Sequence, residues 1–380
     1  MRRRTARALL VLVSAIAGPA ITGPAAAAAA AAPGVSALAA GYGHTCAVRT
    51  DGTLWCWGSN GTGQLGNGTT TGSSTPIHIG DATNWTALDA GTSYTCGVRS
   101  DGTLWCWGSN NRGQLGDGTT TDRNVPTRVG TATDWAGVSA GDSHTCGVRT
   151  DGTLWCWGFN RLGQLATDAS VWYATSPLQV GTATDWASVT AGFAHSCAIR
   201  TDRTLWCWGD STAGQLGIGS LSYTITPTRV GTANDWTGVT AGYAYTCGVR
   251  ADGTLWCWGE NGYGQLGVSG TYQTTPVQVG AATTWARVNA GFNTTCATRA
   301  DGSLWCWGNN ADGQVGDGTT THRYAPVQAG SASSAFVTGY HTCAARADGT
   351  LWCWGYNWAG QLGDGTTTNR SAPGQVALPS

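Results

Sequence analysis

The sequence predicts an all-β protein, a β-propeller of seven blades with four strands per blade and one hairpin disulfide per blade. A Trp-Cys-Trp core recurs in tandem, starting at Trp55, Trp105, Trp155, Trp206, Trp256, Trp305 and Trp352. The steps between cores are 50, 50, 51, 50, 49 and 47 residues. This period is typical of one supersecondary unit that must stack on its neighbours to bury its faces. Each copy holds four short strand candidates separated by glycine-rich turns, and no stretch shows the apolar period of a helix.

Residues 1–32 are predicted to be a signal peptide with an alanine-rich tract, and residues 33–380 a single propeller domain. Four arginines, the last at Arg7, precede an apolar run from Ala8 to Ala17 and then alanines with A-x-A cleavage patterns. The apolar run is too short to span a bilayer, and no later segment is apolar enough to do so. We therefore expect a secreted or extracytoplasmic protein, in the medium or the cell envelope, with no membrane span.

The first strand of each copy is expected at Leu38–Gly41, with Val138–Gly141 as an example of its equivalents. The second and third strands form a hairpin, His44–Arg49 and Thr53–Trp57, joined by a three-residue loop that ends in Gly52. This loop length sets Ala47 opposite Trp55 and predicts a left-handed conformation for Gly52. A small residue stands opposite the first tryptophan in all seven copies, which supports the register.

The same register sets the two cysteines of each copy directly opposite each other, with nine residues between them. Directly opposite residues on paired strands approach closely enough for a disulfide. Free buried thiols are the alternative, and zinc is disfavoured because this spacing is no familiar zinc pattern. The predicted bridges are Cys46–Cys56, Cys96–Cys106, Cys146–Cys156, Cys197–Cys207, Cys247–Cys257, Cys296–Cys306 and Cys343–Cys353.

A glycine-rich loop and an outer strand complete each copy. In the first copy the loop covers Gly58–Gly68, and the fourth strand is expected at Pro76–Ile79, with proline at the start of an edge strand. A tryptophan follows in the connection to the next copy at five of six junctions, and Phe336 is expected to replace it at the last. The ring is expected to close with residues 373–378 beside residues 35–40, because a ring without a seam exposes no sheet edge.

The charge balance argues against a nucleic-acid partner. All 20 basic residues are arginines and four of them lie in the first seven positions, so residues 33–380 carry 16 positive charges against 21 acidic residues. The resulting net charge of −5 provides no basic surface for phosphates.

The residue pattern resembles a known repeat family. The order A-G-x-x-H-T, D-G-x-L-x-x-W-G, N-x-x-G-Q-L-G and a proline strand is similar to the regulator of chromosome condensation repeat. The resemblance runs from about Val35 to the C-terminus and implies a seven-bladed propeller. Two departures are Arg203, which replaces the hairpin glycine of the fourth copy, and Gln164–Thr167, where the third copy lacks the expected glycines.

Three motifs have a functional reading that we weigh against a structural one. The G-x-G-x-x-G match at Gly61–Gly66 is not followed by a helix, so we expect a turn rather than a dinucleotide site. His44, His144, His195 and His341 are expected to make structural hydrogen bonds rather than to hold a metal. Asp117, Asp317 and Asp364 provide one carboxylate per loop, which is weak support for calcium.

Three hypotheses for the function follow. The first is an exported scaffold, predicted to be a monomer, that binds another protein or a cell-envelope component. A secreted propeller similar to this chain inhibits β-lactamases, so the resemblance allows an inhibitor. The second is guanine-nucleotide exchange on a small GTPase, which the family resemblance implies but an exported, disulfide-bonded chain does not favour. The third is an enzyme. No nucleophile has a recognisable base beside it, so we expect no enzyme and no cofactor or metal.

The candidate binding residues follow the A-G dipeptide at the end of the first strand, where the copies differ most informatively. One such turn per blade would form a ring around one mouth of the channel. The predicted protein-binding residues are Tyr42, Phe193, Tyr243, Phe292 and Tyr340. The alternatives are that these rings pack between blades, or that Trp172, Tyr173, Tyr356 and Trp358 on other loops form the binding surface.

Overall fold

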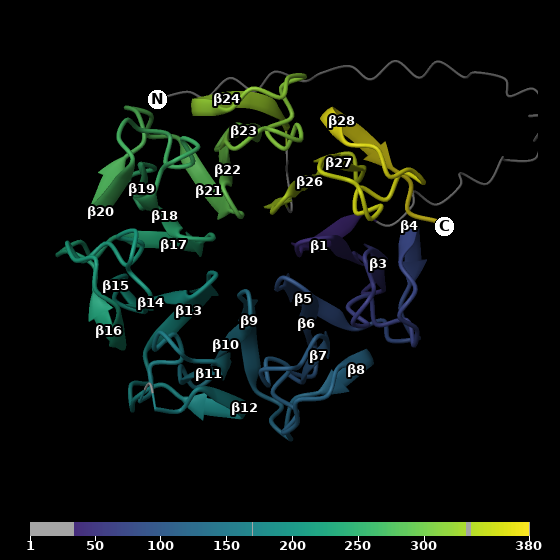
Figure 1. Cartoon of the computed structure of the whole chain (residues 1–380), viewed down its shortest axis with the longest axis horizontal. Helices are drawn as coiled ribbons and strands as arrows, with labels where there is room; N and C mark the ends of the chain where they lie inside the picture. Colours follow the sequence, from purple (N-terminus) through teal and green to yellow (C-terminus); the bar gives the residue numbers. More distant parts are fainter. Residues whose placement is uncertain (1–33, 169, 332–335, 380) are drawn as a thin grey trace, which may run out of the picture. The chain divides into compact units, whose positions relative to one another are not determined.

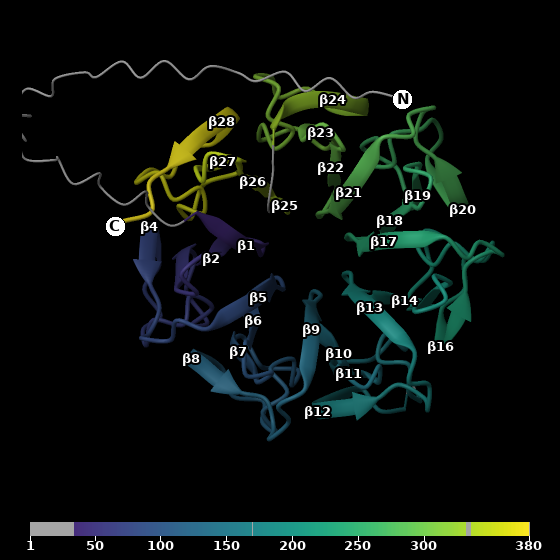
Figure 2. The same cartoon turned by 180° about the vertical axis from the view of Figure 1, so that it is seen from behind.

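The computed structural model describes residues 34–168, 170–331 and 336–379, which form seven four-stranded antiparallel sheets around a central channel (Figures 1 and 2). The predicted seven-bladed propeller is therefore confirmed. The predicted signal peptide lies outside the described residues. Within the described part of the chain, no helix has the length and hydrophobicity that a membrane span requires.

The four strands of each blade follow one another in the sequence, and the first lies at the channel. The first strands are β1 (Val35–Ala40), β5 (Trp85–Ala90), β9 (Trp135–Ala140), β13 (Trp186–Ala191), β17 (Trp236–Ala241), β21 (Trp285–Ala290) and β25 (Phe336–Thr338). The second strands are β2 (His44–Arg49), β6 (Tyr94–Arg99), β10 (His144–Arg149), β14 (His195–Arg200), β18 (Tyr245–Arg250), β22 (Thr294–Arg299) and β26 (His341–Ala345).

The third and fourth strands complete each blade toward the outside of the ring. The third strands are β3 (Leu54–Gly58), β7 (Leu104–Gly108), β11 (Leu154–Phe159), β15 (Leu205–Gly209), β19 (Leu255–Glu260), β23 (Ser303–Gly308) and β27 (Leu351–Gly355). The fourth strands are β4 (Ser73–His78), β8 (Arg123–Arg128), β12 (Tyr173–Gln179), β16 (Thr224–Arg229), β20 (Tyr272–Gln278), β24 (Arg323–Ser331) and β28 (Arg370–Val376).

The central hairpin of each blade has the predicted register. In the first blade Ala47 faces Trp55 and Cys46 faces Cys56, and Gly52 in the loop has a φ of 79°. All seven predicted cysteine pairs are disulfides with Cα atoms 4.1 Å apart, and no cysteine is free. The register and the bridges follow from the same loop length, because that length alone decides which residues stand opposite each other.

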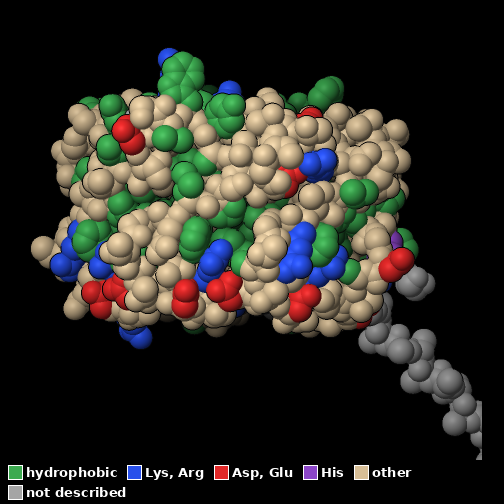
Figure 3. Space-filling model, turned by 90° about the horizontal axis from the view of Figure 1, so that it is seen from below, with side chains coloured by type: hydrophobic (Ala, Val, Ile, Leu, Met, Phe, Trp, Pro, Cys, Tyr) green, Lys and Arg blue, Asp and Glu red, His purple; other side chains and the backbone are tan. Residues whose placement is uncertain are grey.

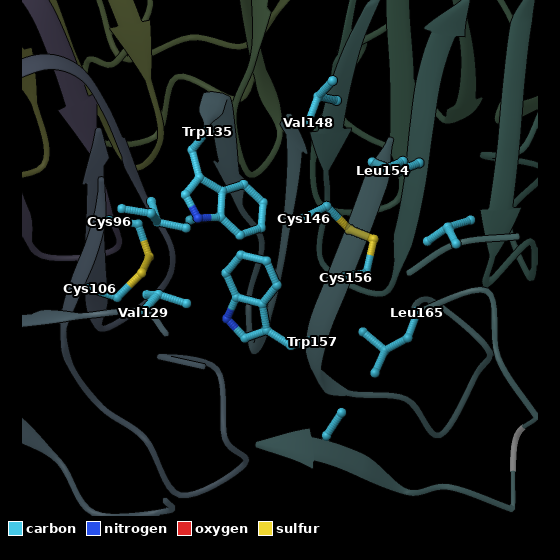
Figure 4. Packing of buried hydrophobic residues seen from close by; sticks show 14 of the residues in the cluster. Cys96, Cys106, Val129, Trp135, Cys146, Val148, Leu154, Cys156, Trp157 and Leu165 are labelled. Atoms are coloured by element: carbon cyan, nitrogen blue, oxygen red, sulfur yellow. A yellow bond between two sulfur atoms is a disulfide. The ribbon is translucent and has the colours of Figure 1, made fainter. Parts of the chain in front are cut away.

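Tryptophans fill the space between neighbouring blades. Figure 4 shows Trp135 and Trp157 of the third blade lying between two disulfides, Cys96–Cys106 and Cys146–Cys156. The two indole centroids are 5.7 Å apart, and Trp157 is fully buried. Aromatic rings of this size provide most of the buried apolar area between two sheets.

The glycine-rich loops dock each blade onto the next one. The Gln114 carbonyl accepts hydrogen bonds from Trp157 Nε1 (3.0 Å) and Thr145 Oγ1 (2.8 Å) of the following blade. A Cβ on Gly116 would lie 2.6 Å from Trp157 Nε1, so this position requires glycine for close approach. The G-x-G-x-x-G pattern therefore has a structural role, as expected.

Three details of the strand prediction are wrong. The five connecting tryptophans are the first residues of the inner strands β5, β9, β13, β17 and β21, so the inner strands begin earlier than expected. Phe336 does not replace these tryptophans. It pairs with Ala344, so its equivalent in the second blade is Leu88, which pairs with Gly97, and not Trp85 at the start of the strand. Pro76 lies inside β4 rather than at its start. The pairing with β3 shifts its register around Pro76, so the strand tolerates the missing N–H donor of proline there.

The two ends of the propeller meet as predicted, but at a seam between two complete sheets. Val35 and Leu38 of β1 belong to the same hydrophobic cluster as Val376 of β28, and Leu378 packs against it. The Gln361 carbonyl of the last blade accepts bonds from Thr45 Oγ1 (2.7 Å) and Trp57 Nε1 (2.9 Å) of the first. The ring therefore closes with the same docking contacts that join the second and third blades, and no strand is exchanged.

Candidate functional site

Backbone hydrogen bonds hold the turns at Tyr42, Asp142, Phe193 and Tyr243 to the neighbouring blade. The amide of Tyr42 donates a hydrogen bond to the Thr92 carbonyl, and the amide of Tyr243 donates to the Gly291 carbonyl, both at 3.2 Å. The Gly43 carbonyl in turn accepts a bond of 2.7 Å from the Ser59 amide, at the start of the loop between the third and fourth strands. These turns and loops therefore lie on one side of the ring, which we call the upper face.

The five predicted binding residues are brought together on the upper face. They come from five consecutive blades around the ring, the fourth to the seventh and the first, and we call them the aromatic arc: Tyr42, Phe193, Tyr243, Phe292 and Tyr340. The ring centroids lie 4.3 Å apart in Phe193–Tyr243, 5.9 Å in Tyr243–Phe292, 4.3 Å in Phe292–Tyr340 and 4.6 Å in Tyr42–Tyr340. Tyr42, Phe193 and Tyr243 each keep 38% of their surface exposed. The rings therefore pack on one another at the channel mouth and not in the buried core between blades.

The second and third blades complete the mouth with polar residues. They carry Thr92 and Asp142 in the position of the aromatic residues, and the Thr92 hydroxyl donates a hydrogen bond of 2.6 Å to Asp142 Oδ1. The Ser143 hydroxyl donates to the second oxygen, Oδ2, at 2.8 Å. The mouth is therefore aromatic on one side and acidic on the other.

A belt of polar side chains lies in the channel below the mouth. Asp89 Oδ2 accepts bonds from the Ser139 hydroxyl and the Ala140 amide of the next blade, both at 2.9 Å. The following blades repeat this contact, each with an oxygen that accepts from a backbone amide one blade on: Ser139, Thr190, Thr240 and Asn289.

The first blade has Ala39 at the belt position, which provides no side-chain acceptor. Asp89 compensates with its second oxygen, Oδ1, which accepts a 2.9 Å bond from the amide of Ala90. Burial raises the pKa of the Asp89 carboxyl, while these hydrogen bonds act against the rise.

The mouth and the belt line one cavity of about 330 Å³. Its lining includes Tyr42, Phe193, Tyr243 and Phe292 of the aromatic arc, together with Asp89 and Asp142. The sequence analysis selected neither of these two carboxylates. The position after the A-G dipeptide was a signal for Asp142, whereas nothing in the repeat pattern singled out Asp89.

The two faces of the ring differ in chemistry. Among the described residues, every exposed large hydrophobic side chain lies in a first turn, in a loop between the third and fourth strands, or within the first three residues of an outer strand. All these segments belong to the upper face or the edge beside it. Figure 3, an edge-on view, shows hydrophobic side chains along the upper border and most charged ones along the lower border.

The lower face carries the hairpin loops and is stabilised by stacked cations. The guanidinium of Arg99 lies 4.5 Å from the ring centroid of Trp85 and 4.1 Å from that of Trp105. Asp101 in the adjacent loop accepts bonds from the Thr103 hydroxyl (2.6 Å) and amide (3.0 Å), which lower its pKa. Asp101 thus bonds within its own loop and Arg99 stacks on both indoles, so the lower face offers no comparable free aromatic surface within the described residues.

The aromatic residues that the sequence analysis gave as alternative binding candidates are also on the upper face. All but one of them lie apart from the aromatic arc. Tyr356 lies 6.1 Å from Tyr340, centroid to centroid, and extends the arc. Trp172, Tyr173 and Trp358 are at least half exposed, at 64%, 50% and 65%, and Trp172 has the guanidinium of Arg161 5.7 Å from its ring.

The four repeated histidines are structural, as expected. Each is fully buried and its Nε2 lies 2.6 to 2.9 Å from a hydroxyl of the next blade, for example His44 to Thr95. Burial lowers the pKa of His44 to about 4 and that of His144, His195 and His341 to about 3.

The loop aspartates considered for calcium bond within their own loops. Asp117 Oδ1 accepts from the Thr119 hydroxyl (2.7 Å), and Oδ2 pairs with Arg123 Nε at 2.7 Å. No group of three or more His, Cys, Asp or Glu side chains among the described residues is arranged to hold a metal ion.

Comparison with known proteins places this geometry in a family. The family model described as RCC1-like domain matches residues 18–337, and two models of the regulator of chromosome condensation (RCC1) repeat match residues 333–361 and 348–380. No curated protein matches the sequence.

Three solved structures share the fold. Human WBSCR16 matches with a TM-score of 0.78 at 20% identity, over 86% of this chain and 94% of that protein. Prp20p from Saccharomyces cerevisiae, described with its binding properties to Gsp1p and histones, matches with a TM-score of 0.75 at 19% identity, over 85% of each chain. The ectodomain of the receptor kinase CR4 from Physcomitrella patens matches with a TM-score of 0.53 at 23% identity, over 86% of this chain and 75% of that one. Because the first family model spans more than half of the sequence and the seven repeats form the expected blades, this chain belongs to the RCC1-like domain family.

Proposed function

We propose that this chain is an exported protein-binding scaffold that holds its partner on the upper face, centred on the aromatic arc. The observation that supports this proposal most is the continuous contact of five partly exposed rings at the mouth of the channel. Three of the rings, Tyr42, Phe193 and Tyr243, are on turns whose amides bond to the next blade. Aromatic side chains on a rigid support are favoured as binding hot spots, because they bury a large area and lose little rotamer freedom.

The asymmetry of the two faces supports the same proposal. Large apolar side chains that remain exposed on one side of a monomer mark a site of interaction. The upper face combines the arc with further exposed rings on the surrounding loops, such as Trp358 and Tyr263. A partner that covers the channel mouth would therefore reach a second circle of aromatic contacts.

Export is the second part of the proposal. Seven disulfides are typical of proteins that work in an oxidising compartment. The predicted signal sequence at residues 1–32 agrees with this, and the fold also occurs in the ectodomain of a receptor kinase. The partner is then a secreted or cell-envelope protein. If the scaffold covers the active site or binding surface of that partner, it acts as an inhibitor.

Regulation of a small GTPase is the alternative. The relative Prp20p is described with its binding properties to Gsp1p. Small GTPases work in reducing compartments, where disulfides are rare, so the bridges weigh against this role. The proposal also assigns a binding role rather than catalysis to the channel.

Affinity capture with the oxidised domain tests the proposal. The bait is residues 33–380 with all bridges intact, and the source is the extracellular fluid in which the protein occurs. Tyr243→Ala and Phe292→Ala are expected to weaken binding of the captured partner by about 2 kcal/mol each while the melting temperature stays nearly unchanged. Ser100→Ala is the control, because Ser100 is exposed in a hairpin loop of the lower face, away from the proposed binding surface.

Three outcomes would contradict the proposal. Capture by both arc variants at the wild-type level would show that the arc does not bind the partner. Unfolding of both variants would show that the rings are part of the core. A captured partner that is a cytosolic GTPase, released by nucleotide, would favour the alternative.

A further inference from the structure

We propose that the mouth of the channel receives a basic side chain of the partner, with arginine preferred over lysine. This inference rests on the proposed function and specifies its chemistry. The partner protein is inferred to present one arginine on a protruding loop, whose aliphatic stem lies along the aromatic arc and whose guanidinium reaches the carboxylates of the channel.

The charges of the cavity support a cationic ligand. Among the described residues, Asp89 and Asp142 are the only Asp, Glu, Arg or Lys side chains in the lining of the 330 Å³ cavity. Neither belongs to an ion pair formed by the described residues. Their hydrogen-bond donors are hydroxyl and amide groups, which carry no net charge. In a channel with low-dielectric walls, such uncompensated carboxylates attract and concentrate cations.

The depth of the two carboxylates fits a long side chain. Asp142 lies in a turn at the mouth, whereas Asp89 lies on strand β5, three positions before the turn residue Thr92. A cation that enters between the rings thus meets a first carboxylate at the rim and a second one deeper in the channel. Arginine and lysine both carry an apolar stem that suits the aromatic part of this path.

The aromatic arc adds a preference for guanidinium. Cations are attracted to aromatic faces, and a planar guanidinium also stacks on rings and forms paired hydrogen bonds with carboxylates, which an ammonium group does not. The protein already uses this chemistry on the lower face, where Arg149 lies 4.9 Å from Trp135 and 4.1 Å from Trp155.

The arginines of the upper face do not fill the site themselves. Arg112 lies 4.1 Å from the Phe159 ring and Arg161 lies 5.7 Å from the Trp172 ring, and neither lines the cavity. The mouth is therefore open to a cation that another molecule provides.

Short peptides with a single central residue test the inference directly. The probes are acetylated and amidated Gly-Gly-X-Gly-Gly, where X is arginine, lysine, citrulline or glutamate, titrated into the oxidised domain by NMR. Citrulline keeps the shape of arginine without its charge. We expect binding in the order arginine, lysine, citrulline, no binding of glutamate, and weaker arginine binding as salt is raised.

Two isosteric variants separate the site from the general charge of the face. Asp142→Asn keeps an acceptor for Thr92 and is expected to weaken the arginine peptide about tenfold, as loss of a charge-assisted hydrogen bond does. Asp122→Asn removes the same charge elsewhere and is expected to leave binding unchanged. Asp122 Oδ1 accepts a bond from the Asn110 amide, and Asn369 makes the same bond to Asn357 in the seventh blade, so this control mimics a natural repeat.

The outcomes distinguish this inference from the scaffold proposal. Equal binding of the arginine and citrulline peptides, or equal loss in Asp142→Asn and Asp122→Asn, would overturn it. If no peptide binds although the partner is captured and lost in Phe292→Ala, the scaffold proposal holds and the arginine inference is wrong. The arginine peptide could bind through Asp142 while partner capture is unchanged in Asp142→Asn and in the arc variants. The site would then not take part in binding the partner, and the inferred arginine of the partner would be wrong.

Discussion

Four buried histidines join neighbouring blades through a hydrogen bond that leaves one ring nitrogen without a partner. The Thr95 hydroxyl donates to the Gln64 carbonyl, so its oxygen accepts from His44 Nε2. His44 Nδ1 is buried and has no hydrogen-bond partner, as in His144, His195 and His341. Protonation would place a charge and an unpaired N–H on this nitrogen, which explains why burial lowers the pKa of these residues.

The first prediction concerns the pH dependence of stability. The folded-state pKa values of about 3 to 4 lie below the ordinary value of 6.5, so only the unfolded chain binds protons at these histidines between pH 6.5 and 4. Their contribution is fully present above pH 6.5 and is lost as the pH falls toward the folded-state values. Near pH 5 the free energy of unfolding is expected to drop by about 5 kcal/mol per pH unit for four groups. Urea unfolding at pH 7, 6 and 5 measures this slope.

The chain provides its own control for this prediction. The second and fifth blades have Tyr94 and Tyr245 in place of histidine, and the Tyr94 hydroxyl donates to the His144 carbonyl of the next blade at 2.6 Å. His144→Tyr is therefore expected to fold and to reduce the slope by about a quarter. A slope that stays the same would show that the histidines are not its source. The raised pKa values of Asp89, Asp312 and Glu260 act in the opposite direction at lower pH.

The second prediction concerns a strained hairpin loop. Arg203 has a φ of 63°, whereas the equivalent residue in the other six blades is glycine. A side chain in the left-handed region costs about 1 kcal/mol, so Arg203→Gly is expected to stabilise the protein by about that amount in urea unfolding. Gly152→Arg is the converse variant: its Cβ would lie 2.2 Å from the Thr184 carbonyl oxygen, so it is expected to cost more. Destabilisation by Arg203→Gly would refute the strain argument.

At the level of the element, the hairpin and its bridge are the constant part of each blade. The third prediction is that the denatured, unreduced protein yields no free thiol in a titration, since all seven pairs are bridged. A disulfide that closes a loop of ten residues contributes roughly 2–3 kcal/mol through the unfolded chain. Replacing Cys146 and Cys156 by alanine is expected to lower the free energy of unfolding by about 2 kcal/mol and to keep the fold. Detection of free thiols would contradict the bridged state.

At the level of the whole molecule, stability depends on the seam between the last and the first blade. Strand β28 completes the seventh sheet, and Val376 and Leu378 pack against Val35 of β1. Beyond the strand, the Pro379 carbonyl accepts a hydrogen bond from the Arg49 guanidinium. In other blades the equivalent arginine stacks on a tryptophan of the inner strand, as Arg99 does on Trp85, but β1 of the first blade has no tryptophan. The C-terminal residues therefore substitute for part of the inter-blade packing.

The fourth prediction follows from this seam. Deletion of residues 371–380 removes nearly all of β28 and is expected to lower the melting temperature of the whole ring in one cooperative transition, because it exposes an edge and opens the cluster around Val35. Deletion of residues 377–380 keeps the strand and is expected to cause a smaller loss. An unchanged melting curve after the longer deletion would show that the seam does not stabilise the ring.

The repeat, the hairpin register and the disulfides can all be predicted from the amino-acid sequence. The register and the disulfides depend on residues at most about ten positions apart, and seven copies of the same spacing test each inference seven times. The sequence also selected the aromatic positions at the channel mouth, since residues that vary between otherwise constant repeats stand out. The positions of Trp85 and Phe336 were misjudged because the start of an inner strand is decided by packing against the neighbouring blade rather than by local pattern.

The way in which the separate turns combine depends on how the blades pack in three dimensions. Phe193 and Tyr42 are far apart in the sequence, and the closure of the ring brings them into one arc through Tyr243, Phe292 and Tyr340. The same closure places Asp89 and Asp142 in the cavity that the arc borders. The physical reason is that contacts between blades depend on the angle at which rigid sheets stack around the axis, and no single repeat encodes which residues then meet across the channel.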